Sequence, residues 1–422
     1  MTDPDAPISV ADKSFPAATY GWSSSTFDAA ALALDEFPTP LLTLDADRID
    51  SNIRVMSHWC SSAGFELAPH GKTTMTPSIW QQQLDAGAWG ITLATPWQVQ
   101  VARQYGVQRI LLANALVDPV QLRWIAQELD EHPDFDFFCW ADSVEAVELM
   151  DSVLAGERGS ERVQVIVELG AEGGRTGARS IAAALEVARA IRQSDQLTLA
   201  GCGGYEGAVG HDRGVDALAR VAAYLDALVE LHRQLEGGEQ YETGQPIVTV
   251  GGSAYLDQVA TKLGPVTSSA TVLVRAGAYV IHDDGFYSRI SPLDHERFDG
   301  GLRSAMHAWA RVVSRPEPGL AILDAGKRDV PVDEGLPVPQ AVVGASREAS
   351  DAILAGAVLT AVNDQHAFLR LADGATTSDL PVGTVVRLGL SHPCTALDKW
   401  RAIPVIASLD DPTVVGFVRT QF

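Results

Sequence analysis

The chain has 422 residues, of which 46% are hydrophobic and 20% are charged, and its formal net charge is −23. This composition excludes an intrinsically disordered protein and predicts a globular one with two or three domains. Acidic residues outnumber basic ones by 54 to 31, which argues against nucleic acid or an anionic membrane surface as a partner, because a negatively charged protein surface repels both.

The amino-terminal residues 1–14 are polar and acidic, and no run of about 18 apolar residues follows them. We therefore expect neither a signal peptide nor a membrane-spanning segment, and a cytoplasmic protein. The four cysteines have no paired spacing, so in a reducing compartment we expect thiols. Residues 1–38 as a whole lack a clear hydrophobic period and are expected to form an arm that packs on a β domain.

Beyond this arm, short apolar runs alternate with amphipathic stretches, which is typical of repeated strand–helix units around a parallel sheet. Thr76–Pro77 and Thr95–Pro96 each indicate a helix start, in which the threonine caps the helix and proline takes the first helical position. Gly64, Gly87 and Gly106 stand where helices should end.

Nine apolar runs are predicted to be strands: Leu41–Asp45, Phe65–Pro69, Gly90–Ala94, Ile110–Asn114, Phe135–Trp140, Val163–Leu169, Leu197–Cys202, Ile247–Gly251 and Val272–Arg275. A (β/α)8 TIM-type barrel has eight strands, so one end segment should lie outside the barrel. We assign the barrel to residues 39–285.

After residue 285 the helix signals fade, and apolar runs are broken by Gly, Pro and Asp. Strands are predicted at Leu320–Asp324, Phe368–Leu371, Val385–Leu390 and Val414–Val418. The predicted fold is therefore α/β, a (β/α)8 barrel followed by a C-terminal antiparallel β domain over residues 286–422.

Lys72 follows the apolar run Phe65–Ala68, within the segment Pro69–Thr74. A lysine at the carboxyl end of a barrel strand, beside His70 and followed by hydroxyl side chains, is placed to enter a pocket. Withdrawal from water would lower the affinity of its amine for a proton and make it a nucleophile toward an aldehyde. The alternative is an ordinary loop lysine.

Two further strand ends carry residues suited to a flat, anionic ligand. Arg175 lies in the glycine-rich loop Glu168–Gly177, where its side chain can approach a ligand closely and favour an oxyanion such as a phenolate. Tyr205 comes just after the next predicted strand, where its ring could lie against a flat cofactor. Alternatively, Arg175 pairs with a nearby carboxylate and Tyr205 belongs to the core.

A phosphate site is predicted after the strand Ile247–Val250. The backbone amides of Gly251 and Gly252 and the hydroxyl of Ser253 stand before a predicted helix, and such helix starts bind phosphate. Loops after the last barrel strands commonly do so. Gly277 and Tyr279 could complete this site, unless these segments are only a turn and the next strand.

His392 and Cys394 follow the apolar run Val385–Leu390. Positions two apart in an extended chain point to the same side, so both side chains can meet one metal ion. Imidazole nitrogen and thiolate sulfur together suit Zn²⁺, although a catalytic zinc usually has three protein ligands. The alternative is a loop histidine beside a buried cysteine.

Together these residues resemble a known family. The motifs that carry the resemblance are Pro69–Lys72, Arg175–Gly177, Tyr205–Gly207, Gly251–Ser253, Asp324–Gly326, and His392–Cys394 with Asp398–Trp400. From about Pro40 to its carboxyl end the chain resembles the D-serine dehydratase and D-threonine aldolase family, whose members are fold type III pyridoxal-phosphate enzymes with an alanine racemase-like barrel.

The resemblance implies a cofactor, pyridoxal 5′-phosphate, attached covalently to Lys72. It also implies that Arg175 faces the phenolic oxygen of the cofactor and that Tyr205 contacts its ring, with His70 nearby. The remaining cofactor residues, which would hold its phosphate, are Gly251, Gly252, Ser253, Gly277 and Tyr279. Family members form homodimers, so a homodimer is expected.

Dehydratase-like members carry His-x-Cys and hold zinc, whereas D-threonine aldolases carry His-x-Asp. Cys394 thus implies a zinc-dependent dehydratase, with His392 and Cys394 as metal ligands, that converts a D-3-hydroxy amino acid such as D-serine or D-threonine to a 2-keto acid and ammonia. The segment Asn363–His366 departs from the family's Glu-His-Gly pattern, so the resemblance leaves the substrate open.

The alternatives are a metal-dependent D-threonine-type aldolase and a D-threo-3-hydroxyaspartate dehydratase. A racemase would need a second acid or base on the opposite face of the cofactor, for which the sequence offers no clear candidate. A non-catalytic pyridoxal-phosphate-binding protein would need Lys72 and the phosphate site, but no metal and no β domain.

Overall fold

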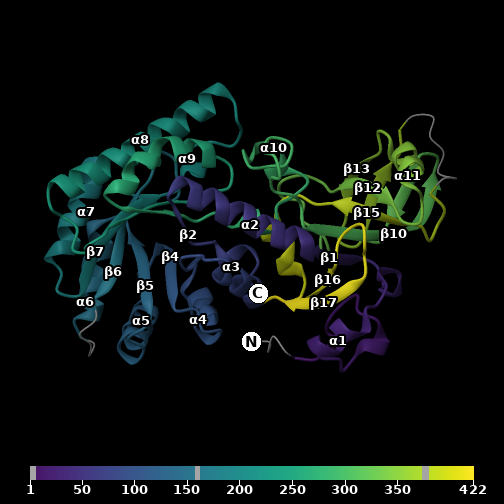
Figure 1. Ribbon diagram of the computed structural model, residues 1–422, viewed down its shortest axis with the longest axis horizontal. Helices are drawn as coiled ribbons and strands as arrows, with labels where there is room; N and C mark the ends of the chain where they lie inside the picture. Colours follow the sequence, from purple (N-terminus) through teal and green to yellow (C-terminus); the bar gives the residue numbers. More distant parts are fainter. Residues whose placement is uncertain (1–5, 157–161, 373–379) are drawn as a thin grey trace. The chain divides into compact units, whose positions relative to one another are not determined.

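A computed structural model describes residues 6–156, 162–372 and 380–422 of the chain (Figure 1). The chain forms two compact units. One consists of Met1–Val55, Thr73–Ile79 and Ala278–Phe422, and the other of Met56–Lys72 and Trp80–Gly277. The second of these contains a parallel sheet and is called the barrel unit below, whereas the first contains a largely antiparallel sheet and is called the β unit.

The sheet of the barrel unit has eight parallel strands in the order β2-β9-β8-β7-β6-β5-β4-β3. Their bounds are β2 Glu66–Leu67, β3 Ile91–Leu93, β4 Arg109–Ala115, β5 Asp136–Ala141, β6 Val163–Leu169, β7 Leu197–Gly204, β8 Ile247–Val250 and β9 Thr271–Val274. A parallel bridge between His70 and Thr92 joins the two end strands. The predicted TIM-type barrel is therefore confirmed.

Helices alternate with these strands along the chain, and Figure 1 shows α5 to α8 around the outside of the sheet. Their bounds are α2 Ala46–Ala63, α3 Pro77–Asp85, α4 Pro96–Gln104, α5 Pro119–Glu131, α6 Val144–Leu154, α7 Ile181–Gln193, α8 Val215–Gly237 and α9 Leu256–Leu263. Inward-facing strand residues fill the barrel, and this cluster consists of Ala68, Leu111, Phe138, Trp140, Ile166, Ala200, Ile247 and Leu273.

The predicted helix boundaries have clear physical causes. Thr95 caps α4, because its hydroxyl accepts a hydrogen bond from the Gln98 amide at 3.3 Å. Gly64, Gly87 and Gly106 end α2, α3 and α4 with φ angles of 71°, 91° and 78°. Only glycine adopts such left-handed angles without steric cost, so these three residues stop the helices where the sequence predicts.

The β unit contains a sheet of nine strands. Their bounds are β1 Leu41–Asp45, β10 Met306–Glu317, β11 Leu320–Leu323, β12 Val338–Val342, β13 Val358–Val362, β14 Ala367–Arg370, β15 Val385–Gly389, β16 Ala402–Ile406 and β17 Val414–Arg419. Short helices α1 Ser24–Ala30, α10 Phe286–Ile290 and α11 Arg347–Leu354 accompany them. The long strand β10 pairs antiparallel with β1, β11 and β15.

The first predicted strand, Leu41–Asp45, belongs to this second sheet and not to the barrel. As β1 it pairs antiparallel with β10 and parallel with β16, and all five of its residues are buried. Nine runs for eight barrel positions are thus accounted for. The structure therefore differs from the range 39–285 at both ends, since residues 278–285 also belong to the β unit.

The amino-terminal arm packs on the same sheet. Its core residues are Ile8, Phe15, Phe27 and Phe37, which cluster with Leu41, Trp309 and Phe417. A buried ion pair fixes the arm further, because Arg419 Nη1 donates to Asp12 Oδ1 at 2.9 Å and both side chains are less than 5% exposed. The same guanidinium donates to the carbonyl oxygens of Ala6 and Pro7.

The Asp12–Arg419 pair generates a stability prediction. We expect Asp12→Ala to lower the free energy of unfolding by about 3 kcal/mol or more, because it leaves the Arg419 guanidinium buried without its carboxylate. Urea unfolding followed by tryptophan fluorescence would measure this loss. Asp35→Ala, which removes an exposed carboxylate of the same arm, should change stability by no more than about 0.5 kcal/mol. Equal losses in the two variants would contradict the role of the pair.

Candidate active site

Polar side chains gather at the carboxyl ends of the barrel strands. In a parallel barrel these ends all lie at the same end of the barrel. The residues concerned are His70 and Lys72 after β2, Glu168 in β6, Tyr205 and Glu206 after β7, Gly251 to Ser253 after β8, and Arg275 after β9.

Lys72 occupies a 3-10 turn, Gly71–Thr73, that is packed against the barrel. A Cβ atom at Gly71 would lie 2.8 Å from the indole nitrogen of Trp80 and 2.9 Å from the Ile91 side chain. Trp80 Nε1 also donates to the Gly71 carbonyl at 3.2 Å. Only glycine fits this contact, so it sets the path of the backbone that presents Lys72, whose side chain is half-buried.

His70 is held in its neutral form. Burial, together with the positive charges of Lys72 and Arg275, keeps the pKa of His70 well below its usual range. Its backbone amide donates to Ala276 O at 3.3 Å, which fixes the residue at the mouth of the barrel. Its ring nitrogen Nδ1 is buried and has no hydrogen-bond partner among the described residues, so this atom is available to a ligand.

Arg175 and Tyr205 are brought together, although different strands carry them. The Arg175 guanidinium carbon lies 5.8 Å from the centre of the Tyr205 ring, which is within cation–π range. Arg175 is exposed and Tyr205 is half-buried. The loop of Arg175 is anchored at Gly177, whose amide donates to Asp142 Oδ2 at 2.9 Å. A cation and an aromatic face thus line one side of this mouth.

The turn Gly251–Ser253 rests on the carboxyl group of Glu206. The Gly251 amide donates to Glu206 Oε2 at 3.1 Å. Gly252 has a φ angle of +121°, and a Cβ atom there would lie 2.6 Å from Glu206 Oε1, so only glycine can occupy the position. Ser253 is buried, and its hydroxyl oxygen has no partner among the described residues.

Two charged residues of this site are missing from the sequence prediction. Glu206 is fully buried, and burial raises its pKa to about 7. Arg275 is buried over the Trp140 ring, and burial lowers its pKa to about 10. Its Nε donates to Thr249 Oγ1 at 2.9 Å, and its Nη2 donates to Gly204 O.

The sequence does contain a signal that could have identified Arg275 as a site residue. Arg275 follows the apolar run Val272–Val274, just as Lys72 follows the run Phe65–Ala68. Glu206 gives a weaker signal, since it is marked only by its place next to Tyr205. Glu168 is a third buried acid, and burial raises its pKa to about 7 although Thr176 Oγ1 donates to it at 2.8 Å.

These residues fit pyridoxal phosphate. Unsatisfied buried polar atoms are costly, at about 1–3 kcal/mol each, and three of them point to a polar ligand: His70 Nδ1, Glu206 Oε1 and Ser253 Oγ. The Gly251–Ser253 turn presents backbone and hydroxyl groups of the kind that bind phosphate. Gly277 lies two residues beyond Arg275 in the barrel unit, whereas Tyr279 is buried in the β unit.

His392 and Cys394 lie in the turn that follows β15, in the β unit. His392 Nδ1 is 2.5 Å from Asp333 Oδ2, and Thr73 Oγ1 is 3.3 Å from Cys394 Sγ. Burial alone would lower the pKa of His392, but hydrogen bonds and charge from Cys394 and Asp333 outweigh it and raise that pKa to about 9. The two predicted metal ligands therefore lie in one turn, close enough for Cys394 to raise the pKa of His392.

The donor set of this turn suits zinc, because imidazole nitrogen and thiolate sulfur are the ligands that zinc prefers. Within the described ranges no group of three or more His, Cys, Asp and Glu side chains is arranged to hold a metal ion. The protein thus offers two ligands from one turn. Thr73, which touches Cys394, is joined to Lys72 by a peptide bond.

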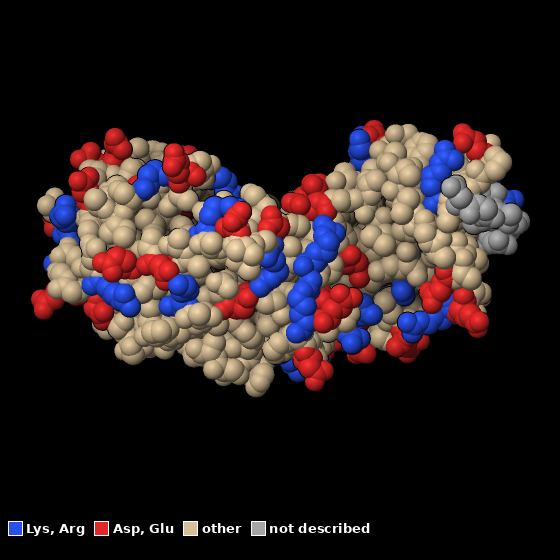
Figure 2. Space-filling view, turned by 90° about the horizontal axis from the view of Figure 1, so that it is seen from above, with Lys and Arg blue, Asp and Glu red and all other residues tan. Residues whose placement is uncertain are grey.

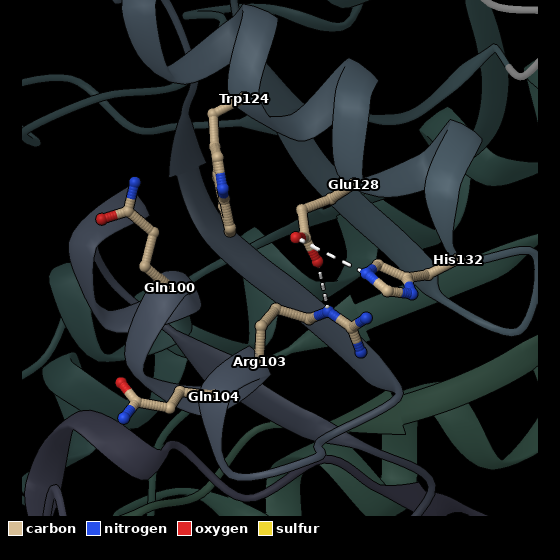
Figure 3. A pocket seen from close by; sticks show the side chains of 6 residues that line it. All are labelled: Gln100, Arg103, Gln104, Trp124, Glu128 and His132. Carbon is tan, nitrogen blue, oxygen red and sulfur yellow. Dashed lines mark hydrogen bonds and ion pairs between the residues drawn. The ribbon is translucent and has the colours of Figure 1, made fainter.

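Two cavities among the described residues are lined by other side chains. The first, of about 370 Å³, is between α4 and α5 and is lined by Gln100, Arg103, Gln104, Trp124, Glu128 and His132 (Figure 3). Arg103 Nε pairs with Glu128 Oε2 at 2.9 Å, so the charges in it are paired. It opens where α4 and α5 lead back to the amino-terminal ends of strands, at the opposite end of the barrel from Lys72.

The second cavity, of about 480 Å³, is lined by Lys327 and by Asn363–His366. These four residues form the turn between β13 and β14, in which the Asn363 amide donates to His366 O at 2.8 Å. The segment that departs from the family pattern is therefore a tight hairpin turn of the β unit.

The surface carries charges of both signs. Figure 2 shows basic side chains interspersed with acidic ones over the face drawn there. None of the helices in the described part of the chain combines the length and apolar character that crossing a membrane requires.

Comparison with known proteins gives consistent results. Residues 305–406 match the family model described as "Putative serine dehydratase domain". The chain is 27% identical over 358 residues to D-threonine aldolase of an Arthrobacter species, which covers 84% of this chain and 85% of the relative. It is 27% identical over 384 residues to D-threo-3-hydroxyaspartate dehydratase of a Delftia species, which covers 88% of this chain and 94% of the relative.

Solved structures share the fold. D-threonine aldolase from Filomicrobium marinum matches with a TM-score of 0.75 at 23% identity, over 92% of this chain and 97% of that one. A cysteine-to-alanine variant of D-threo-3-hydroxyaspartate dehydratase in its metal-free form matches with a TM-score of 0.72 at 23% identity, over 92% and 99%. A further variant of that dehydratase replaces a histidine two positions before this cysteine.

The buried carboxyl of Glu206 generates a pH prediction. Its pKa of about 7 in the folded protein exceeds the value near 4.3 of an unfolded glutamate, so folding favours the protonated form. Without cofactor, the free energy of unfolding should therefore fall as pH rises from about 4.5 to about 7, by up to about 1.4 kcal/mol per pH unit for this group.

Glu206→Gln should reduce this slope, and urea unfolding of the cofactor-free protein at a series of pH values would measure it. Glu172→Gln, which changes an exposed residue of the Arg175 loop, serves as the control and should keep the full slope. An unchanged slope in Glu206→Gln would show that this carboxyl does not titrate in that range.

Proposed function

Because the chain resembles D-threonine aldolase and D-threo-3-hydroxyaspartate dehydratase over most of its length, we propose that it belongs to their family and is a pyridoxal-phosphate- and zinc-dependent dehydratase. Its substrate would be a D-3-hydroxy amino acid such as D-serine or D-threonine, and its products a 2-keto acid and ammonia. It would thus be a carbon–nitrogen lyase among the lyases to which both relatives belong.

The feature that carries this proposal is the placement of His392 and Cys394 in one turn, where Cys394 raises the pKa of His392. The dehydratase relative has a histidine and a cysteine with the same spacing, and the variant that lacks this cysteine is described in a metal-free form. Thr73 is the residue after Lys72 in the chain, and its hydroxyl oxygen contacts Cys394. This supports the proposal that the Lys72 segment and the His392–Cys394 turn act on the same substrate.

The cofactor would be held by groups at the mouth of the barrel. Lys72 would attach it, Gly251 to Ser253 would bind its phosphate, and Arg175 and Tyr205 would contact its ring. When bound, pyridoxal phosphate supplies an electron-withdrawing ring that stabilises negative charge on the α-carbon of the substrate. Exclusion of water from the buried part of this mouth, where Glu206, Ser253 and Arg275 lie, would strengthen the polar contacts there.

Lys72 is the group that we propose to move the α-proton, because its Nζ is a basic atom at the carboxyl end of β2. The positive charges of Arg275 and Arg175 act on the neighbouring His70. The amine of Lys72 accepts a proton in its neutral form. A zinc ion held by His392 and Cys394 would polarise the 3-hydroxyl group, which must leave in a dehydration.

A metal-dependent D-threonine-type aldolase is the second candidate, and the identity to the Arthrobacter enzyme favours it. In an aldolase the bond between the α- and β-carbons breaks, so the products are glycine and an aldehyde. The same metal ion at the 3-hydroxyl group would serve either reaction, because a polarised hydroxyl is both a better leaving group and a stronger acid.

A product assay decides between the two reactions. Incubated with D-serine, D-threonine or D-threo-3-hydroxyaspartate, the protein should release a 2-keto acid and ammonia in equal amounts. Both products are measured by standard enzymatic assays, with glycine and aldehyde measured in parallel. Lys72→Ala is the control and should form neither pair of products. Glycine as the main product would exclude the dehydratase and leave the aldolase.

The metal is tested separately. Cys394→Ala should lower kcat by at least about 100-fold, because zinc would lose one of its two protein ligands, while the absorbance of the bound cofactor should stay in place. Cys60→Ala removes a buried thiol from α2, a helix that carries none of the proposed site residues, and should keep full activity. Full activity in Cys394→Ala, or activity unaffected by a chelator, would contradict a catalytic zinc.

A further inference from the structure

His392 has a strained backbone that the surrounding structure holds in place. Its φ angle is 68° and its ψ angle is 87°, a left-handed conformation that costs a residue with a Cβ atom about 1–2 kcal/mol. The compensating contact is made by Asp283, a buried residue of the β unit, whose Oδ2 accepts the His392 amide at 2.9 Å. Such strain at a single side chain points to a functional demand on its direction.

Asp283 is itself fixed. Its other oxygen, Oδ1, accepts the amides of Gly285 at 3.0 Å and Tyr287 at 2.8 Å at the start of α10. A Cβ atom at Gly285 would lie 2.2 Å from the Cβ of Ser391, so this loop packs directly on the residue before His392. Asp283 and the loop around Gly285 thus fix the backbone of His392.

Asp333 fixes the orientation of the imidazole ring through a hydrogen bond. His392 Nδ1 lies 2.5 Å from Asp333 Oδ2, and Thr395 Oγ1 donates to Asp333 Oδ1 at 2.7 Å. Both oxygens of the carboxylate are therefore engaged, and both partners belong to the metal turn. With Nδ1 occupied by Asp333, Nε2 is the ring atom that remains for a metal ion.

The loop that carries Asp333 connects β11 to β12 and is anchored four residues earlier, at Asp329. Lys13 Nζ donates to Asp329 Oδ1 at 2.9 Å and lies 3.7 Å from the centre of the Trp400 ring. Trp400 Nε1 donates to the Asp329 carbonyl at 3.0 Å. These contacts restrict the loop, so Asp333 meets His392 from a supported position.

We propose that Asp333 is a positioning residue for the metal site, which holds the His392 ring in the tautomer and orientation that present Nε2 to the ion. This inference rests on the zinc site of the proposed function. A carboxylate on the second ring nitrogen is a general feature of metal-binding histidines, and its removal weakens metal binding by about 10–100-fold. Nothing in the His-Pro-Cys sequence itself reveals Asp333, which lies far away in the chain.

The alternative is that Asp333 and His392 form only a surface ion pair. The Asp333 side chain is 42% exposed, and such pairs contribute little to stability. Both views therefore predict that Asp333 variants fold normally, but they differ on metal affinity. A direct metal titration distinguishes them.

The test uses Co²⁺ as a spectroscopic replacement for zinc. Protein stripped with a chelator and dialysed is titrated with CoCl₂, and the charge-transfer absorbance between the Cys394 thiolate and cobalt reports binding. Asp333→Ala should show the same band but bind Co²⁺ about 10–100-fold more weakly. Asp333→Asn retains a side-chain oxygen that can accept the Nδ1 hydrogen, so it should keep most of the affinity.

Glu334→Gln is the matched control for charge, since it neutralises the exposed carboxylate next to Asp333, and it should bind Co²⁺ as the unaltered protein does. Thermal melting of each variant checks the fold. Unaltered affinity in Asp333→Ala would overturn the positioning role. Equal losses in the Asn and Ala variants would also overturn it, because charge and not orientation would then matter.

The titration also separates this inference from the proposed function. If the unaltered protein gives no thiolate–cobalt band, or gives one that Cys394→Ala leaves in place, the metal site itself is overturned. If that band is present and depends on Cys394, the Asp333 variants test the positioning role alone.

Discussion

All eight barrel strands run in the same direction, and this constraint assembles the candidate active site. Each parallel strand delivers the residue after its carboxyl end to the same end of the barrel. His70 after β2, Glu206 after β7 and Arg275 after β9 meet there for that reason. Glycines then let the backbone approach these groups closely. Gly252 is the clearest case, since a side chain at its φ angle of +121° would collide with the Glu206 carboxyl.

Burial decides the charge of this site. In a medium of low polarity the uncharged form of each acid or base is favoured, so His70 stays neutral and the pKa values of Glu168 and Glu206 rise to about 7. Arg275 keeps a pKa of about 10 and therefore its charge at neutral pH. The site thus combines many hydrogen-bonding atoms with one permanent buried cation, which suits an anionic, aromatic cofactor.

The β unit supplies the second set of reactive groups by a different route. The long strand β10 pairs with β15, and the turn after β15 carries His392 and Cys394. Asp283 and Asp333 hold His392 from two loops, and Thr73 contacts Cys394.

The sequence by itself determined the strands of the barrel, the helix ends at Gly64, Gly87 and Gly106, and the segments around Lys72 and His392, because hydrophobic period, positive φ angles and strand-end position are local properties. Only the tertiary structure decided that Leu41–Asp45 joins the second sheet, since its pairing partners β10 and β16 come from the other end of the chain. The same holds for Glu206, Arg275 and Asp333. Their roles depend on burial and on partners distant in sequence, and desolvation and hydrogen-bond geometry exist only once the chain has folded.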